Sequence, residues 1–441
     1  MSARTKRMKS KSVVGIDIAD HTLSIVELQK YRNNPRVSSV ARVAIPPGIL
    51  ARGRIRDTEK LQELFEYALA KADPAPISGR IAIMGIPDSQ LYTHLARLPK
   101  QKDNELDKSA LEEALRTFPV EKRDLIYAYR VVSHSDEGTD ILLIAASKEV
   151  LREWDLFFHR LGITVPFYDS EVLATARGLT TRTLDDAFCL VDIGAASTTV
   201  SVFDAKGIRY VHSIGNAGSA LTESIAKIES LPFDEAQKRK HDLDLSDIPT
   251  SLAGILPSFF DPAIAEINTA IQYVLHAYDI TVKKIILVGG TSALKGLPEY
   301  MHDAIGIETL RGKPIIGIGK DDEHGVQSSR EEPSIESVGL ALHGLNAHEY
   351  EHEPKLQSSP EEIRQSEEDG KRDAPQAYDA NAGQMKEFHD IRKEQRRMRR
   401  QIAVLVMVLT VGAILIAAAF WYQRAEQERK ESSIHKLTNP D

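Results

Sequence analysis

Cysteine is almost absent from this chain of 441 residues, which contains a single one, Cys189. One thiol excludes a disulfide framework and also a metal site built from cysteines. A chain with so little cysteine is suited to a reducing compartment. Because Cys189 stands in the apolar run AFCLVDIG, we expect it to be a buried strand residue and not a nucleophile.

The chain also lacks an excess of positive charge and an apolar run near its start. Its formal net charge is −8, so the balance of charges does not predict that the folded body binds nucleic acid. The opening residues, SARTKRMKSK, are basic, but no long apolar segment follows them, so we expect no secretory signal. We interpret residues 1–12 as a solvated basic tail.

Two kinds of pattern alternate between Val13 and Asn346. Runs such as VVGIDIA, CLVDIG and KKIILVGG predict strands, whereas TEKLQELFEYALAKA and KEVLREWDLFFHRLG have the apolar spacing of helices. Strands mixed with helices indicate an α/β architecture. Since one core is not expected to serve so long a chain, we predict two or more packed units within residues 13–346.

Composition changes after Asn346. Residues 347–400 are acidic and rich in Pro, Ser and Gln, and they have too few aliphatic side chains to offset the entropy of ordering. We predict that they form a disordered linker, which ends in the basic juxtamembrane segment RKEQRRMRR.

A long uncharged run follows this linker, from Ile402 to Tyr422. It is long enough for a hydrocarbon core of roughly 30 Å, so we predict one transmembrane helix over residues 401–422. The arginines before it predict that the body of the protein is cytoplasmic and that residues 423–441 form a short extracytoplasmic tail.

Two stretches far apart in the chain have the same design, VVGIDIADHTLSIVELQK and LVDIGAASTTVSVFDAKG. Each is an apolar strand that ends near an aspartate, followed by a turn of small and polar residues and a second strand. Such a turn can aim backbone N–H groups at an anion, and Gly194, Ser197 and Thr198 suit that role. Two facing turns would clamp a polyphosphate, and Asp17 and Asp192 would bind Mg²⁺.

A third stretch, KKIILVGGTSALKG, is a buried type of strand that ends in Gly289 and Gly290. The lack of side chains there lets a flat base and a sugar approach the backbone. In this order and spacing the three stretches resemble the actin-like ATPase superfamily, in the bacterial branch that includes the FtsA division proteins and the PilM family of type IV pilus assembly.

The likeness to the PilM family spans nearly all of Val13 to Asn346. GIDIADHTLSIVEL resembles its first phosphate motif, VDIGAASTTVSVFDAKG its second, LVGGTSALKGLPEY its adenosine motif and SVGLAL its closing helix. IPPGILARGRIRD resembles the stretch after its third strand, and FPVEKRDLIYAYRVV resembles part of its inserted subdomain.

The resemblance implies an actin-like fold, a duplicated ribonuclease H-like unit of two lobes around a nucleotide cleft. It implies a lower inserted subdomain at about residues 80–165 and an upper subdomain at about 216–282. The implied cofactors are ATP and Mg²⁺, with Asp17 and Asp192 as metal ligands and no residue assigned as catalytic. The residues expected at the nucleotide are Asp17, Ala19, Asp20, His21, Thr22, Asp192, Gly194, Ala195, Ala196, Ser197, Thr198, Lys240, Gly289, Gly290 and Thr291.

The first turn departs from the family pattern of Asp-x-Gly followed by hydroxyl residues and a lysine, because Ala19 and Asp20 follow Asp17 and Ile18. Alanine resists the positive φ that glycine accepts. The charge of Asp20 would repel a phosphate about 4 Å away by roughly 4 kcal/mol unless Mg²⁺ lies nearby. In the motif that resembles the ribose contact, Gln237 replaces a glutamate and only Lys240 carries over. We therefore expect ATP binding that depends on Mg²⁺, with slow or absent hydrolysis.

The function implied by the resemblance is a scaffold of type IV pilus assembly at the bacterial inner (cytoplasmic) membrane. Its groove between the lower subdomains would bind the N-terminal cytoplasmic peptide of a PilN-like membrane protein, and other inner-membrane pilus proteins would assemble with it. The predicted single membrane span is a departure, because the familiar form of the family has none.

Three alternatives remain open. One is a component of the GspL type in type II secretion, against which the short tail after Tyr422 and the intact turn at Asp192 count. An FtsA-like division protein would carry an amphipathic surface helix, whereas the C-terminal run has no polar face. A sugar kinase would need a carboxylate base, for which Asp169 and Glu171 in YDSEVLATAR are the candidates, although capping of a helix explains them equally well.

Overall fold

A computed structural model of the chain describes residues 12–31, 34–179, 186–316, 332–347, 350 and 352–358. All of them belong to one compact unit, Met1–Glu368. The predicted membrane helix over residues 401–422 and the tail over 423–441 lie outside the described residues. Within the described ranges, no helix is both long enough and apolar enough to cross a membrane.

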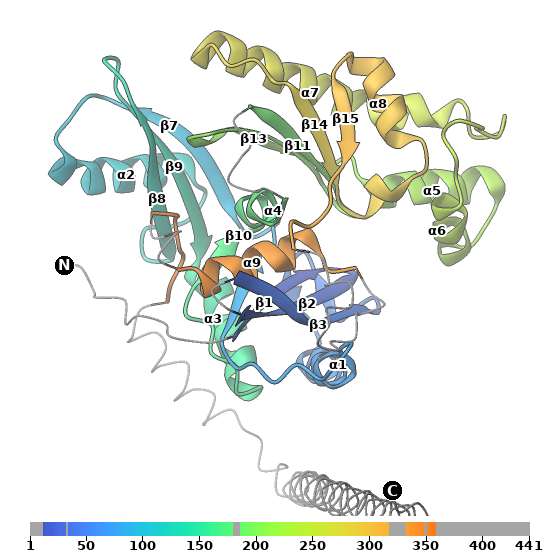
Figure 1. Cartoon of the computed structure of the whole chain (residues 1–441), viewed down its shortest axis with the longest axis horizontal. Coiled ribbons are helices and arrows are strands. Elements are labelled where there is room, and N and C mark those ends of the chain that lie inside the picture. Colours follow the sequence, from blue (N-terminus) through green and yellow to red (C-terminus); the bar gives the residue numbers. More distant parts are fainter. Residues whose placement is uncertain are drawn as a thin grey trace, which may run out of the picture. The chain divides into compact units, whose positions relative to one another are not determined.

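The first lobe is built on a five-stranded sheet in the order β10-β6-β1-β2-β3, of which β1, β2, β3 and β10 are labelled in Figure 1. Two antiparallel hairpins join β1, β2 and β3, while β6 runs parallel to β1 and β10 parallel to β6. Side chains of β1 alternate between two apolar clusters, with Val14 and Ile16 in one and Val13 in the other. The bounds are β1 (Ser12–Ala19), β2 (Thr22–Tyr31), β3 (Asn34–Ala44), β6 (Ala82–Ile86) and β10 (Tyr168–Ser170).

Helices cover both faces of this sheet. On the side of Val14 and Ile16, α1 meets α3 through Phe65 and Phe157, whose ring centroids are 5.6 Å apart. On the side of Val13, α4 and α9 complete the second cluster. The bounds are α1 (Thr58–Lys71), α3 (Lys148–Arg160), α4 (Glu171–Leu179) and α9 (Ile335–Leu345), with a short hairpin of β4 (Leu50–Ala51) and β5 (Arg54–Ile55).

The second lobe repeats the topology of the first. Its sheet has the order β13-β12-β11-β14-β15, in which β11 takes the place of β1, β12 and β13 form the hairpins, and β14 and β15 are the parallel strands. The same path therefore occurs twice in one chain, as the two similar stretches of sequence predict. The strands are β11 (Phe188–Ile193), β12 (Thr198–Asp204), β13 (Gly207–Ile214), β14 (Lys284–Val288) and β15 (Glu308–Arg311).

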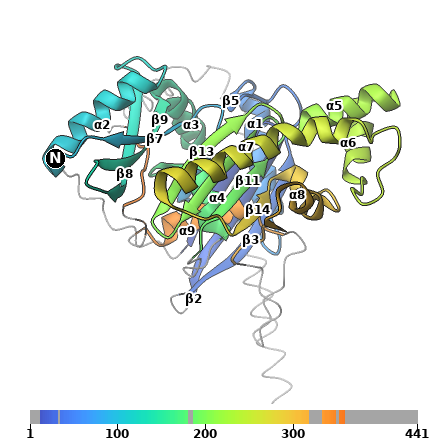
Figure 2. The ribbon, with the colours of Figure 1, turned by 90° about the horizontal axis from the view of Figure 1, so that it is seen from above.

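The long helix α7 lies across the sheet of the second lobe, and α5 and α6 lie at one end of that lobe (Figure 2). A core of aliphatic and aromatic side chains, including Leu256, Phe260 and Ile267 of α7, joins these helices to the sheet. The bounds are α5 (Gly218–Glu229), α6 (Phe233–His241), α7 (Ile255–Tyr278), α8 (Leu297–Ile305) and the short 3₁₀ helix η1 (Gly290–Ala293).

A smaller subdomain is inserted into the first lobe between β6 and α3. It has an antiparallel sheet in the order β7-β9-β8, with α2 against it. Ala110 and Ala114 of α2 pack on Ile141 and Leu143 of the sheet, so the subdomain has its own small core. The bounds are β7 (Tyr92–Leu98), α2 (Asp103–Thr117), β8 (Leu125–His134) and β9 (Thr139–Ser147).

The strands and helices predicted from the sequence patterns are confirmed. VVGIDIA, CLVDIG and KKIILVGG form β1, β11 and β14, and the two helical patterns form α1 and α3. Cys189 is buried in β11, and burial raises the pKa of its thiol to about 12, as expected of a strand residue that is no nucleophile. Of the range 347–400, predicted as linker, the structure describes residues 347, 350 and 352–358, and Leu356 there is fully buried against the body.

The lobes are joined by α4 and α9, which cross at glycines. A Cβ on Gly339 would lie 1.8 Å from the carbonyl oxygen of Ala174, and one on Gly178 would lie 1.9 Å from that of Ile335. α9 approaches β1 as closely, since a Cβ on Gly15 would lie 1.9 Å from the carbonyl oxygen of Ser337. No side chain fits at these three positions without moving backbone.

We expect Gly339→Ala to destabilise the protein by about 1–3 kcal/mol, because the methyl group would force the two helices apart. The control is Gly254→Ala, since a Cβ there meets nothing within 4 Å. Thermal unfolding of the full chain, in mild detergent, measures both variants. Equal midpoints for Gly339→Ala and the parent chain would contradict the close crossing.

Candidate nucleotide and metal site

The two aspartates of the repeated stretches occupy equivalent positions in their hairpins. Asp17 of β1 pairs across the ladder with Ser24 of β2, and Asp192 of β11 pairs with Thr199 of β12. Each aspartate is thus followed, after the same number of residues, by a hydroxyl residue directly opposite. This register confirms that the two turns are duplicates.

The turns themselves have similar backbones. In the second, the N–H of Gly194 donates to the carbonyl oxygen of Ser197 at 3.0 Å, and in the first, Ala19 pairs with Thr22. The expectation that Ala19 strains the first turn is wrong, because neither Ala19 nor Gly194 has a positive φ. Ala19 is the last residue of β1, in an extended conformation that alanine adopts as readily as glycine.

Asp20 has partners inside the first lobe. Its carboxylate accepts hydrogen bonds from the backbone N–H groups of Arg52 and Gly53, at 2.8 and 2.9 Å. Both donors lie in the left-handed region, with φ of 52° and 70°, which forms a small concave nest for an anion. This local anion site reduces the repulsion that Asp20 would exert on a phosphate. Its contact with the nucleotide, like that of the exposed His21, stays a prediction.

The second turn is bonded to the start of α5. The N–H groups of Gly218 and Ser219 donate to the carbonyl oxygens of Gly194 and Ala195, each at 2.9 Å. The Nζ of Lys240, from α6, donates to the carbonyl oxygen of Gly218 at 3.0 Å. Burial lowers the pKa of Lys240 to about 8. The structure therefore brings this predicted cation to the turn predicted to bind phosphates.

The glycines after β14 also reach this turn. A Cβ on Gly289 would lie 2.3 Å from the Oδ1 of Asp192, so only glycine fits there, and its φ of 81° requires glycine as well. A Cβ on Gly218 would lie 2.4 Å from the Oγ1 of Thr291. Gly290 is exposed, and a Cβ there meets nothing within 4 Å. Of the predicted residues of the second lobe, these contacts bring Asp192, Gly194, Lys240, Gly289 and Thr291 close together.

Five carboxylates converge where the two hairpins face each other, and we call them the acidic cluster. Burial is the largest cause that raises the pKa of each, and charges of the other members raise several of them further. The pKa of Asp17 rises to about 6 and that of Asp192 to about 7, each from 3.8. The cluster consists of Asp17, Asp88, Glu171, Asp192 and Glu336.

The acidic cluster has the geometry of a site for a hard cation. One oxygen atom each from Asp17, Glu171 and Glu336 lies within 4.8 Å of the others. The Oε1 of Glu336 is buried without a hydrogen-bond partner. Among the described residues, no ion pair connects the cluster to a basic side chain, although the charge of Arg42 lowers the pKa of Asp17. An all-oxygen donor set fits Mg²⁺ or Ca²⁺.

Hydrogen bonds join members of the cluster to one another, to α9 and to the second lobe. The Oγ1 of Thr199, in the second lobe, donates to the Oδ2 of Asp88, in the first, at 2.9 Å. The N–H of Asp88 donates to the Oε2 of Glu171 at 3.0 Å. The Oγ of Ser334, which begins α9, donates to the Oδ2 of Asp17 at 3.0 Å.

Sequence reasoning missed two members of the cluster. Asp88 comes directly after the parallel strand β6, and acids that bind ligands or act in catalysis often follow such strands. This placement could have identified Asp88 as a candidate site residue. Glu336 lies in the first turn of α9, and nothing local marks it. Glu171 appeared only as a candidate base of a sugar kinase.

Asp169, the other candidate base, lies away from the cleft. It is fully buried in an ion pair with Arg177, at 2.9 Å, and accepts a second contact from the Nδ1 of His343. Although burial opposes it, the charges of Arg177 and His343 hold the pKa of Asp169 well below its usual range. Asp169 is thus structural and cannot act as a base on a substrate in the cleft.

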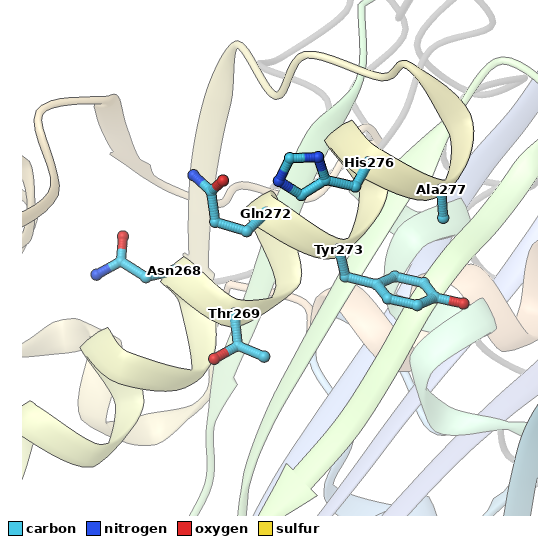
Figure 3. A pocket seen from close by; sticks show the side chains of 6 residues that line it. All are labelled: Asn268, Thr269, Gln272, Tyr273, His276 and Ala277. Atoms are coloured by element: carbon cyan, nitrogen blue, oxygen red, sulfur yellow. The ribbon is translucent and has the colours of Figure 1, made fainter.

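A surface hollow elsewhere, on α7, is lined by Asn268, Thr269, Gln272, Tyr273, His276 and Ala277 (Figure 3). All six belong to one helix of the second lobe, and none is a predicted site residue. This hollow is separate from the acidic cluster.

Comparison with known proteins places these features in a family. The family described as type IV pilus assembly protein PilM matches residues 15–344. A solved PilM–PilN type IV pilus biogenesis complex is 21% identical, with a TM-score of 0.62 over 76% of this chain and 98% of that chain. The ethanolamine utilisation protein EutJ from Carboxydothermus hydrogenoformans is 18% identical, with a TM-score of 0.46 over 76% and 91% of the two chains. The fold is therefore actin-like.

Curated relatives include cell division proteins. FtsA of Pseudomonas aeruginosa is 27% identical over 213 residues, which are 42% of this chain and 49% of that protein, so the match spans about half of its length. FtsA of Staphylococcus epidermidis is 20% identical over 347 residues, which cover 68% of this chain and 73% of that protein.

We expect Asp192→Asn to stabilise the metal-free protein at pH 8, and to stabilise it by less at pH 5. The native pKa is raised, so the folded state binds more protons than the unfolded state between about pH 4 and 7, and stability falls as the pH rises through this window. A rise from 3.8 to about 7 corresponds to an upper bound of about 4 kcal/mol at pH 8. Water reaches part of the side chain, so we expect about 1–3 kcal/mol.

Urea unfolding of the full chain with a chelator, at pH 5 and pH 8, measures this difference. The control is Asp303→Asn, an exposed aspartate of the same lobe, which should change stability little at either pH. Destabilisation by Asp192→Asn at pH 8 would show that the carboxylate is not held under strain by its neighbours.

Proposed function

The chain belongs to the type IV pilus assembly protein PilM family, and from this membership we propose that it is a membrane-anchored, actin-like scaffold of pilus assembly that binds ATP and Mg²⁺ between its lobes. The observation that carries the proposal is the matched register of Asp17 and Asp192, which gives each lobe an equivalent turn beside the shared acidic cluster.

The second lobe supplies a surface suited to a nucleotide. The turn from Gly194 to Thr198 would bind phosphates through its backbone N–H groups and hydroxyls, and the first lobe would add the turn from Ala19 to Thr22. Lys240 would contribute a positive charge toward the sugar and phosphates. The exposed backbone at Gly289 and Gly290 would let the base approach without a side chain in the way.

The acidic cluster supports a role for Mg²⁺ in this binding. Asp17, Glu171 and Glu336 would hold the cation from the first lobe and Asp192 from the second. Bound Mg²⁺ would neutralise phosphate charge and bring the phosphates and the carboxylates together. Without a cation these acids would repel a triphosphate, so we propose that binding depends on Mg²⁺.

Slow hydrolysis follows from the same residues. A base for an attacking water would have to be a carboxylate near the phosphates, and the five acids there are the ones suited to bind the cation. A carboxylate whose oxygen atoms bind Mg²⁺ is a weak base, because the cation withdraws the electron pairs that would accept a proton. We therefore propose a protein in which the nucleotide closes the lobes and is turned over slowly or not at all.

A PilN-like membrane protein is the proposed partner, through its N-terminal cytoplasmic peptide. The support is the family and the similarity in fold to a PilM chain solved in a complex named for PilM and PilN. We also propose that the uncharged run within residues 401–422 anchors the chain in the bacterial inner membrane with its body in the cytoplasm. That helix rests on the sequence alone.

We expect Gly290→Val to lower ATP affinity at least tenfold while leaving the stability of the nucleotide-free protein within about 0.5 kcal/mol of the parent. A Cβ at this position meets nothing within 4 Å, so the valine would fill the space proposed for the base and sugar without disturbing the fold. Gly254→Val, also an open position in this lobe, is the control and should bind ATP normally.

Binding of a fluorescent ATP analogue to the full chain, with and without Mg²⁺, measures this prediction, and phosphate release measures hydrolysis. Equal affinity in Gly290→Val would place the nucleotide elsewhere. Tight binding in the absence of Mg²⁺, or rapid steady-state phosphate release, would contradict the proposed role of the acidic cluster.

A further inference from the structure

The last described segment, residues 352–358, adds to the edge of the first sheet, and we call it the edge segment (brown in Figure 1). β10 is the outermost strand of that sheet. The N–H of Tyr168 in β10 donates to the carbonyl oxygen of Leu356 at 2.8 Å, and the N–H of Leu356 donates to that of Tyr168 at 3.1 Å. This reciprocal pair makes Leu356 an antiparallel neighbour of β10.

Side chains hold the edge segment at several points. Leu356 is 0% exposed and belongs to the apolar cluster of Trp154 and Tyr168. Three residues earlier, the carboxylate of Glu353 forms an ion pair with the buried Arg177. The segment therefore places the carboxylate of Glu353 and the aliphatic side chain of Leu356 against the body, and Pro354 between them is also buried.

The contacts come from both the first lobe and the inserted subdomain. Arg130, in β8 of the subdomain, lies 3.9 Å from the carboxylate of Glu353. Asp155, in α3, accepts a hydrogen bond of 2.5 Å from the Oγ of Ser358. The Nζ of Lys355 lies 5.2 Å from the ring centroid of Phe167, which immediately precedes β10. The edge segment thus lies in a groove between these two parts of the molecule.

This groove has the properties of a site for an extended peptide. An exposed sheet edge binds a strand through its backbone, and pockets for alternate side chains give specificity. Here the backbone supplies one reciprocal pair, Arg177 supplies a cationic pocket and the cluster around Leu356 supplies an apolar one. So short a strand, with one bridge to the sheet, is held weakly compared with an element inside the core.

We propose that the edge segment is a displaceable internal strand that occupies a peptide groove, and that a partner must expel it to bind. The partner's segment would be an extended peptide with a carboxylate and, three positions later, an aliphatic residue. The side chains of Glu353 and Leu356 contact the groove at this spacing. The regulatory part of this inference rests on the proposed function, since it assumes that the partner of this protein uses the same groove.

Tethering decides how strongly the edge segment competes. It follows α9 after only a few residues, so its effective concentration at the groove is on the order of millimolar. A free peptide of equal intrinsic affinity would need a similar concentration to displace half of it. Weakening the edge segment should therefore tighten the binding of any peptide supplied from outside.

The test uses Leu356→Asp in the full chain, with a labelled synthetic peptide of residues 350–358, YEHEPKLQS, as the probe. The aspartate cannot occupy the apolar pocket, so the variant should bind the probe at least tenfold more tightly than the parent chain. Gln357→Asp adds the same charge at an exposed position of the same segment and should bind like the parent. A probe with Asp in place of its leucine should bind neither protein.

Amide hydrogen exchange at Tyr168 provides a second measurement. In Leu356→Asp without probe, this amide should exchange faster, and addition of the probe should slow it again. If Leu356→Asp no longer unfolds cooperatively, Leu356→Ala, which removes the side chain without adding charge, decides the outcome and should show a smaller gain in affinity. No gain in a cooperatively folded variant would show that the edge segment is a permanent part of the fold, which overturns the proposal.

These outcomes are independent of the partner, because the probe comes from this chain. If the probe binds as expected but the N-terminal peptide of a PilN-like protein does not compete with it, the proposed partner contact fails while the groove and its internal strand stand. If the probe does not bind but the PilN-like peptide binds elsewhere, the internal strand fails and the proposed function stands.

Discussion

The crowding of five carboxylates at the junction of two lobes is the constraint on which the rest of the structure depends. Like charges brought together in a partly buried cleft cannot all ionise without protons or a cation to compensate them. Burial raises the pKa values of Asp17 and Asp192 toward neutrality, and the charges of Asp88 and Asp17 raise that of Asp192 further. Such a cluster lowers the stability of the fold. Ionisable groups that destabilise a fold in this way are typical of a binding site.

The two helices that connect the lobes both begin at this cluster. Glu171 is in the first turn of α4, and Glu336 is in the first turn of α9, whose capping residue Ser334 donates to Asp17. The N-terminal end of a helix favours negative charge, so both helices stabilise the ionised acids. Because the glycine crossing fixes α4 and α9 against each other, the charge state of the cluster acts directly on the connection between the lobes.

The features that the sequence predicts correctly are local patterns of residues that occur twice along the chain. The strand that ends near an aspartate, followed by a turn and a hydroxyl residue, is visible twice along the chain, and the structure confirms that the two copies match in register. The argument at Ala19 failed for a local reason as well, because a glycine in a family pattern does not by itself require a positive φ. Gly194 has none.

The parts that could not be predicted depend on contacts between distant segments. Glu336 joins the cluster only because α9 packs on β1, and no local pattern indicates that meeting. Leu356 is an isolated aliphatic residue in an acidic stretch, where composition correctly predicts little burial on average. A single leucine finds a pocket because β10 leaves an open edge beside the inserted subdomain, and that edge exists only in the folded molecule.

One short segment connects the groove to the acidic cluster. Tyr168, at the start of β10, pairs with the edge segment, Asp169 bonds to Arg177, and Glu171, directly after Ser170, belongs to the cluster. Arg177 in turn pairs with Glu353 of the edge segment, so the groove touches this stretch through both backbone and side chain. A peptide in the groove and a cation in the cleft would therefore act on the same residues from opposite ends. Coupling between sites requires an element that both ligands bias, and β10 with the first turn of α4 is the element that meets this requirement here.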